Sequence, residues 1–152
     1  MAIYNENFIL LDIEAIKTSD AHNCVRKLYM LGKDGLTCLE AEFLPCKRLR
    51  DLEKKYKKTF YFCQRNIHRL DYYHPTTKLK CRDAKALVYN FAKSLDAKLV
   101  LYKGGHLEKD LCTVIGLDCM NIETVGVKKV YSHDPREEVN LYYQQLLNLD
   151  LI

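Results

Sequence analysis

The stretch FILLDIEAI, residues 8–16, decides the fold class and raises the main question about function. Its apolar residues predict a buried strand, but Asp12 and Glu14 interrupt it. Side chains alternate between the two faces of a strand, so both carboxylates project from one face, about 7 Å apart along the chain. Two such acids repel each other unless a cation lies between them, and Mg²⁺ and Mn²⁺ prefer oxygen ligands. Alone, the pair also fits solvated acids on an edge strand.

Outward from this strand, apolar periodicity and turn residues predict further strands and helices. Asp34-Gly35 supplies a positive-φ turn between two β-rich runs, which predicts a hairpin. The 3.6-residue period marks the helices, one of which is predicted to end at Gly116. The predicted elements are a hairpin of 25–31 and 36–43, a possible extended run over 59–63, a helix over 82–95, a strand over 98–102, a helix over 106–115, a weaker strand over 119–125 and a last helix from Asp134.

The last helix has the clearest start. Asp134 suits the N-cap, Pro135 the first helical position, and Glu137 the reciprocal position of a capping box. Strands and helices in this order indicate a mixed α/β layer architecture, although the strand order cannot be read from it. The predicted buried face of the helix consists of Val139, Tyr142, Tyr143, Leu146 and Leu149.

Length and composition predict one soluble domain. The chain has 152 residues with ordinary hydrophobic and charged fractions, so it can bury a core and has no signature of disorder. No apolar run reaches the roughly 20 residues of a membrane span, and the first residues do not form a signal peptide. We therefore expect an intracellular protein of the cytoplasm or nucleus, without a membrane partner. Its seven cysteines include no CxxC pair and are expected to be reduced thiols.

Positive charge is concentrated in one segment. Between residues 47 and 69 there are nine basic residues and two acidic ones, although the net charge of the whole chain is only +4. Such a segment can be a solvated helix face, or it can bind nucleic-acid phosphates, with its aromatic residues stacking on bases or packing in the core. The candidate nucleic-acid-binding residues here are Lys47, Arg48, Arg50, Lys54, Lys55, Lys57, Lys58, Arg65 and Arg69.

Two later stretches add acids and a histidine. KGGHLEKDL, residues 103–111, places Glu108 at the start of a helix, and HDPREEV, residues 133–139, places His133 five residues before Glu138. Each residue also has a simpler interpretation. Glu108 can be a first-turn acid favoured by the helix dipole, His133 a loop residue and Glu138 a solvated acid.

Taken in order, these motifs resemble those of the DEDDh family of 3′–5′ exonucleases, which have an RNase H-like fold. Asp12 and Glu14 match the first motif, Asp-x-Glu. Glu108 matches the acid that ends the second, and His133 with Glu138 matches the third, His-x4-Asp. The resemblance covers nearly the whole chain. It implies a single domain, residues 1–152, with an RNase H-like mixed sheet of an antiparallel hairpin and then parallel strands, flanked by helices.

The sequence departs from the family pattern at several positions. Both later acids are glutamate where the family has aspartate, so each side chain is one methylene longer. Lys103-Gly104 stands where the family has His-Asn, and Pro135 stands where a small residue is common. These departures concern the geometry of the metal site and therefore the activity.

The resemblance implies a metal-dependent 3′–5′ exonuclease that hydrolyses single-stranded RNA or DNA. His133 would be the general base, because the reference pKa of histidine lies near neutral pH. Lys103 joins the basic residues expected to bind the nucleic acid. Two Mg²⁺ or Mn²⁺ ions would be held by Asp12, Glu14, Glu108 and Glu138.

A second set of potential ligands suggests an alternative. Cys63, His68, His74 and Cys81 are of the types that zinc prefers, although their spacing matches no standard finger. The segment NIHRLDYY, residues 66–73, also resembles Maelstrom-like domains and retroelement-associated reading frames, whose RNase H-like fold can carry a zinc-binding set in place of catalytic acids. The alternative is an inactive, nucleic-acid-binding domain stabilised by zinc. A third possibility is a scaffold that binds RNA or a protein without turnover.

Overall fold

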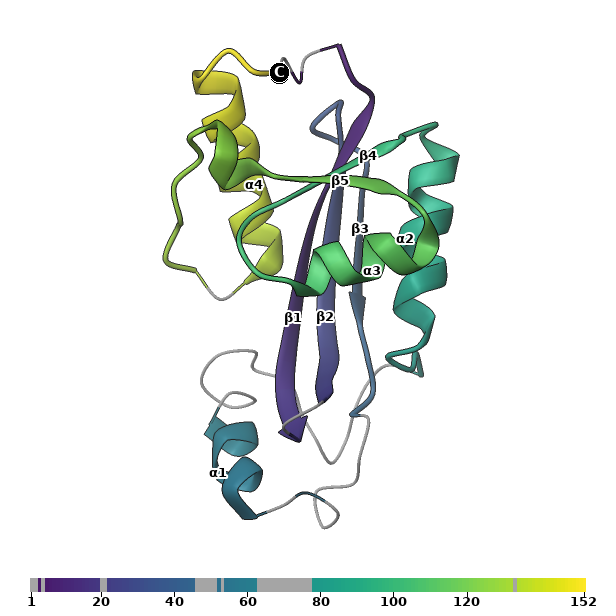
Figure 1. The fold of residues 1–152 in the computed structure, drawn as a ribbon, viewed down its shortest axis with the longest axis vertical. Coiled ribbons are helices and arrows are strands. Elements are labelled where there is room, and N and C mark those ends of the chain that lie inside the picture. Colours follow the sequence, from purple (N-terminus) through teal and green to yellow (C-terminus); the bar gives the residue numbers. More distant parts are fainter. Residues whose placement is uncertain are drawn as a thin grey trace.

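A five-stranded mixed sheet forms the centre of the computed structural model, in the order β3-β2-β1-β4-β5 (Figure 1). The pairs β1–β2 and β2–β3 are antiparallel, and the pairs β1–β4 and β4–β5 are parallel. The structure describes residues 3, 5–19, 22–45, 52, 54–62, 78–132 and 134–152, with the backbone alone for 59–62. The strands are β1 (Phe8–Ser19), β2 (His22–Gly32), β3 (Cys38–Glu42), β4 (Leu99–Tyr102) and β5 (Asp118–Asn121).

The predicted hairpin is confirmed in β2 and β3. Gly35 in the turn has φ of 72°, a conformation that glycine adopts without strain. Asp34 holds the turn, because its Oδ1 atom accepts hydrogen bonds from the backbone N–H groups of Leu36 and Thr37, both at 2.9 Å. An Asx-type turn of this kind fixes the register of the two strands.

Helices cover both faces of the sheet. Figure 1 shows α2 and α4 on opposite sides and α1 beside the far end of β1. The extended run predicted over 59–63 is wrong up to residue 62, because α1 continues through it, and the strand predicted over 119–125 ends at Asn121, whose side chain caps a 3₁₀ helix. The helices are α1 (Lys54–Phe62), α2 (Asp83–Ser94), α3 (Leu107–Ile115), the 3₁₀ helix η3 (Ile122–Val125) and α4 (Pro135–Asn148).

Alternate residues of β1 belong to two different cores. Ile9, Leu11 and Ile13 pack in the core that includes α2, whereas Phe8 and Leu10 pack in the core that includes α4. The period of two therefore places Asp12 and Glu14 in line with Phe8 and Leu10, on the α4 side of the sheet. The two acids share a face, as the sequence predicts.

The pairing between β1 and β4 ends close to these acids. β4 pairs with β1 only over Phe8–Leu10, so the part of β1 that carries Asp12 and Glu14 is paired on its β2 side alone. A β-bulge follows on that side, where Arg26 is the extra residue between the pairs Glu14–Lys27 and Ala15–Val25. Bulges and strand ends are common next to functional sites because they redirect side chains.

The start of α4 follows the prediction with one change. The Asp134 side chain accepts a hydrogen bond from the Arg136 N–H, as an N-cap does. Glu137 does not bond the Asp134 N–H directly, because the Ser132 hydroxyl lies between them, accepting from Asp134 and donating to Glu137. At the other end, Leu149 lies just beyond the helix and is 46% exposed, so its predicted burial is wrong.

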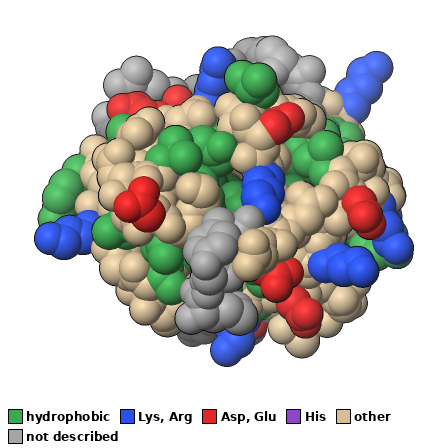
Figure 2. Space-filling model, turned by 90° about the horizontal axis from the view of Figure 1, so that it is seen from above, with side chains coloured by type: hydrophobic (Ala, Val, Ile, Leu, Met, Phe, Trp, Pro, Cys, Tyr) green, Lys and Arg blue, Asp and Glu red, His purple; other side chains and the backbone are tan. Residues whose placement is uncertain are grey.

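Charges of both signs share the surface at the end of the molecule that carries the C-terminus. Figure 2 shows acidic and basic side chains interspersed among apolar ones there, without a patch of one sign among the described residues. No helix in the part of the chain that the structure describes is long and apolar enough to cross a membrane. The five described cysteines, which are Cys24, Cys38, Cys81, Cys112 and Cys119, are free thiols.

Candidate metal centre

Three carboxylates meet where β1 passes the start of α4. One side-chain oxygen from each of Asp12, Glu14 and Glu138 lies within 4.8 Å of the other two. The first two come from one face of β1, and Glu138 comes from the first turn of α4. The position of that turn is fixed by Val139, which is 1% exposed and packs in the core between α4 and the sheet. The cluster therefore joins the first strand to the last helix.

Asp12 lies at the centre of this cluster and is buried, with 8% of its surface exposed. Its Oδ2 atom has no hydrogen-bond partner among the described residues. Burial raises the pKa of Asp12, against the lowering effect of hydrogen bonds to the side chains of Glu138 and Glu14. A buried carboxylate oxygen without a hydrogen-bond partner is costly, and a bound cation would offset that cost.

The two glutamates are half-buried and have strongly raised pKa values. Desolvation, followed by the charge of Asp12, raises the pKa of Glu14 to about 8 and that of Glu138 to about 9. Each carboxylate is thus harder to ionise, first because it is desolvated and then because its neighbours are also acids. Without a cation, the site retains protons at neutral pH.

Two lysines lie beside the cluster, and the sequence interpretation missed both. The charge of Lys27 lowers the pKa of Glu14, and the charge of Lys129 lowers that of Glu138. Neither offsets the effect of burial. The β1–β2 register places Lys27 opposite Glu14, on the far side of the bulge from the pair Ala15–Val25, and periodicity alone does not show that bulge. Lys129 comes from the segment before α4 and has no such local signal.

The cluster fits a divalent cation. Carboxylate oxygens are the ligands of Mg²⁺ and Mn²⁺, and a bound cation would stabilise the ionised form of all three acids. It would also contact Asp12 Oδ2, which has no hydrogen-bond partner among the residues described. The arrangement can therefore hold a metal ion. His133, predicted as the general base, lies outside the described residues.

Glu108, the fourth predicted ligand, makes a different contact. Its Oε1 atom accepts a hydrogen bond of 3.0 Å from the backbone N–H of Ile13, and only 4% of the residue is exposed. It occupies the side of β1 that β4 leaves open after Leu10. Among the described residues, the group of close carboxylates contains the other three acids and not Glu108. Desolvation and the charge of Asp12 raise the pKa of Glu108 to about 7, so it lies close enough to affect the cluster.

This contact predicts opposite effects of two substitutions at Glu108. Glu108→Leu is expected to lower the free energy of unfolding by about 1–3 kcal/mol, because the Ile13 N–H is left buried without an acceptor. Glu108→Gln keeps an acceptor and removes a buried charge, so its stability at pH 8 should equal or exceed that of the wild type. Urea unfolding of both variants measures this. Equal losses in the two variants would show that the charge, and not the hydrogen bond, matters.

The predicted nucleic-acid-binding residues are only partly described. On α1, Lys54, Lys55 and Lys58 are exposed and Lys57 is half-buried, while Tyr56 is buried and belongs to the core. Lys103 pairs with Glu123 through its Nζ atom. Figure 1 places α1 at the end of β1, away from the start of α4. Lys47, Arg48, Arg50, Arg65 and Arg69 lie outside the described residues.

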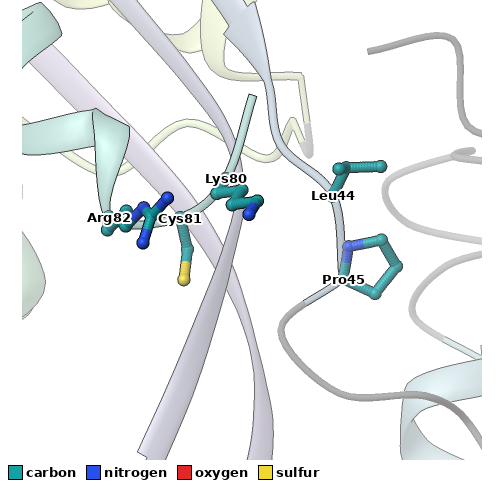
Figure 3. A pocket seen from close by; sticks show the side chains of 5 residues that line it. All are labelled: Leu44, Pro45, Lys80, Cys81 and Arg82. Carbon is teal, nitrogen blue, oxygen red and sulfur yellow. The ribbon is translucent and has the colours of Figure 1, made fainter. Parts of the chain in front are cut away.

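The predicted zinc set is described at one position, Cys81. This residue lies just before α2 and lines a cavity of about 340 Å³, which Figure 3 shows with Lys80 and Arg82 on the same side and Leu44 and Pro45 across from them. None of the three clustered acids lines this cavity. The other predicted zinc ligands, Cys63, His68 and His74, lie outside the described residues.

Comparisons with known proteins add no family to this geometry. No family model matches the chain, and no curated protein matches it. The fold and the carboxylate cluster are therefore the basis for a functional proposal.

Proposed function

We propose that the protein is a metal-dependent 3′–5′ exonuclease that hydrolyses single-stranded nucleic acid. The observation that carries the proposal is the meeting of Asp12, Glu14 and Glu138 within 4.8 Å, around a buried carboxylate oxygen for which the described part of the chain offers no hydrogen-bond partner. The mixed five-stranded sheet is compatible with an RNase H-like arrangement, and these acids occupy the first and third motifs of the resemblance.

The residues of the chain have distinct roles in this proposal. Asp12, Glu14 and Glu138 would hold the divalent cation, and the high pKa values of the glutamates mean that binding must displace protons. Divalent ions at such sites supply charge neutralisation at the phosphate and activation of the attacking water. Glu108 fixes the strand that carries two of the ligands, through the Ile13 N–H. His133 keeps its predicted role as general base.

Glutamate in place of aspartate at position 138 is compatible with this role. The extra methylene lets the carboxylate reach from α4 to within 4.8 Å of the two acids on β1. The helix is held to the sheet by Val139, Tyr142 and Leu146, all buried, so the long side chain spans a fixed gap. The departure from the family pattern therefore leaves the described cluster intact.

The activity can be tested on the purified full chain with single-stranded DNA and RNA labelled at the 5′ end. With Mn²⁺ or Mg²⁺ we expect a ladder of products shortened from the 3′ end, which EDTA abolishes. Glu14→Gln should lose this activity, whereas Asp118→Asn, at an exposed position on β5, should retain it as the matched control. Degradation that persists in Glu14→Gln, or intact strands with the wild type, would contradict the proposal.

A further inference from the structure

The segment between η3 and α4, residues 128–132, presents an unusual set of side chains. Lys128 and Lys129 are exposed, and Tyr131 is 98% exposed, the highest value among the large apolar and aromatic side chains that the structure describes as exposed. A tyrosine ring in water loses the stabilisation that burial would give it. Its neighbours add two positive charges to this aromatic surface.

Specific contacts hold this segment in place at both ends. The Gln145 side chain makes two hydrogen bonds to the backbone of Lys128, accepting from its N–H at 2.8 Å and donating to its carbonyl at 2.9 Å. At the other end, the Ser132 hydroxyl accepts from the Asp134 N–H and donates to Glu137, both at 3.2 Å. The backbone that carries the exposed ring thus lies between two fixed points, which lowers the backbone entropy lost when a ligand binds.

The segment lies beside the carboxylate cluster. Figure 1 shows it running along α4 down to the start of that helix, where Glu138 lies in the first turn. The charge of Lys129 lowers the pKa of Glu138. The charge of Asp134, three residues after Tyr131, raises the pKa of Asp12. A strand bound along this segment would therefore lead toward the start of α4, where Glu138 lies.

The chemistry of the segment fits single-stranded nucleic acid. Proteins bind such strands by stacking bases on exposed aromatic rings and by attracting the phosphates with lysine or arginine. The acidic cluster repels phosphate, so an approaching strand needs positive charge at its border, which Lys128 and Lys129 provide. Duplex nucleic acid does not suit the ring, because its bases are already stacked on one another.

We propose that residues 128–131 form the binding site for the single strand next to the carboxylate cluster, with a base stacked on Tyr131 and phosphates near Lys128 and Lys129. This inference rests on the proposed function for its substrate class and assigns the substrate contact to a segment outside the three acidic motifs. Tyr131 is a positioning residue for the substrate.

Binding to a fluorescent single-stranded decamer, measured by anisotropy without divalent cations, tests the proposal. Tyr131→Ala should weaken binding about tenfold, since stacking contributes about 1–3 kcal/mol per base and 1.4 kcal/mol corresponds to a factor of ten. Tyr131→Phe retains a ring and should bind like the wild type. Tyr89→Ala, which removes a 39% exposed tyrosine from α2, is the matched control and should also bind normally. Lys129→Ala should reduce the salt dependence of binding.

The outcomes separate this inference from the proposed function. Equal affinities of wild type, Tyr131→Ala and Tyr89→Ala, or no binding by the wild type, would overturn the inference. If the wild type binds through Tyr131 but does not shorten the strand with Mn²⁺, the inference stands and the exonuclease proposal fails. If the strand is shortened with the same KM in wild type and Tyr131→Ala, the exonuclease proposal stands and the inference fails.

Discussion

Replacing Asp12 with asparagine is expected to abolish the stabilisation of the protein by Mn²⁺ and to lower nuclease activity by more than about 100-fold. Removing a group that only hydrogen-bonds to a metal ligand lowers metal affinity or activity by up to about 100-fold. Asp12 is itself a ligand in the proposal, so its removal should cost more. Its Oδ2 atom is the buried oxygen of the cluster that has no hydrogen-bond partner within the ranges that the structure describes. Asparagine has the same shape but offers a single neutral oxygen.

The same substitution should stabilise the metal-free protein. At pH 8 the charge of Asp12 raises the pKa of Glu14, Glu138 and Glu108, so removing it relieves repulsion at all three. The new amide can also donate hydrogen bonds to its acidic neighbours, and such bonds to charged groups contribute about 1.5–3 kcal/mol. Urea unfolding with EDTA or with Mn²⁺ measures both effects. Asp118→Asn should change neither, and a loss of stability in metal-free Asp12→Asn would contradict this account.

Raising the pH from 5 to 9 is expected to destabilise the metal-free protein by about 3 kcal/mol through Glu14 and Glu138, and Glu108, whose pKa is about 7, adds to the loss in the same direction. Glu14 and Glu138 keep protons in the folded state up to about pH 8 and 9, whereas in the unfolded chain they ionise near pH 4.5. The folded state therefore binds more protons between these values, and its stability falls as the pH rises. This free energy is well below what the full pKa shifts of the two glutamates would give. Both side chains are partly exposed, so water, Lys27 and Lys129 screen their charges.

Divalent cation should oppose this loss of stability. A ligand that binds only the folded state at 100 times its Kd adds about 2.7 kcal/mol. Because the acids must lose protons to bind metal, the stabilisation by Mn²⁺ should increase from pH 5 to pH 8. Urea midpoints at five pH values, with and without Mn²⁺, measure it, and Asp12→Asn should give a flatter profile. A metal-free profile that rises with pH would contradict the assignment of the raised pKa values.

Local signals predicted the elements that depend on neighbours in sequence. The apolar run in residues 8–16 was sufficient for β1, Asp34-Gly35 for the hairpin, and Gly116, with φ of 75°, for the end of α3. They also predicted that Asp12 and Glu14 share a face. In these places a few adjacent residues decide the conformation.

The features that were missed depend on distant parts of the chain. Glu108 bonds to Ile13 because β4 ends early and leaves one side of β1 open, which periodicity cannot show. The pairing of Lys103 with Glu123 likewise joins a strand end to the 3₁₀ helix. At residues 59–62 the aromatic run suggested an extended strand, but the backbone continues the helix from Lys54, since tertiary context overrides local propensity.

The carboxylate cluster also sets an order of events during synthesis, because its members are far apart in sequence. Asp12 and Glu138 are separated by 126 positions. At about 5–20 residues per second, the ribosome adds Glu138 roughly 6–25 seconds after Asp12. Throughout that interval the nascent chain has two of the three ligands and no α4 to supply the third. If the cluster binds a metal ion as proposed, capture of the ion and docking of the last helix become one step, which a chain stopped before residue 138 cannot complete.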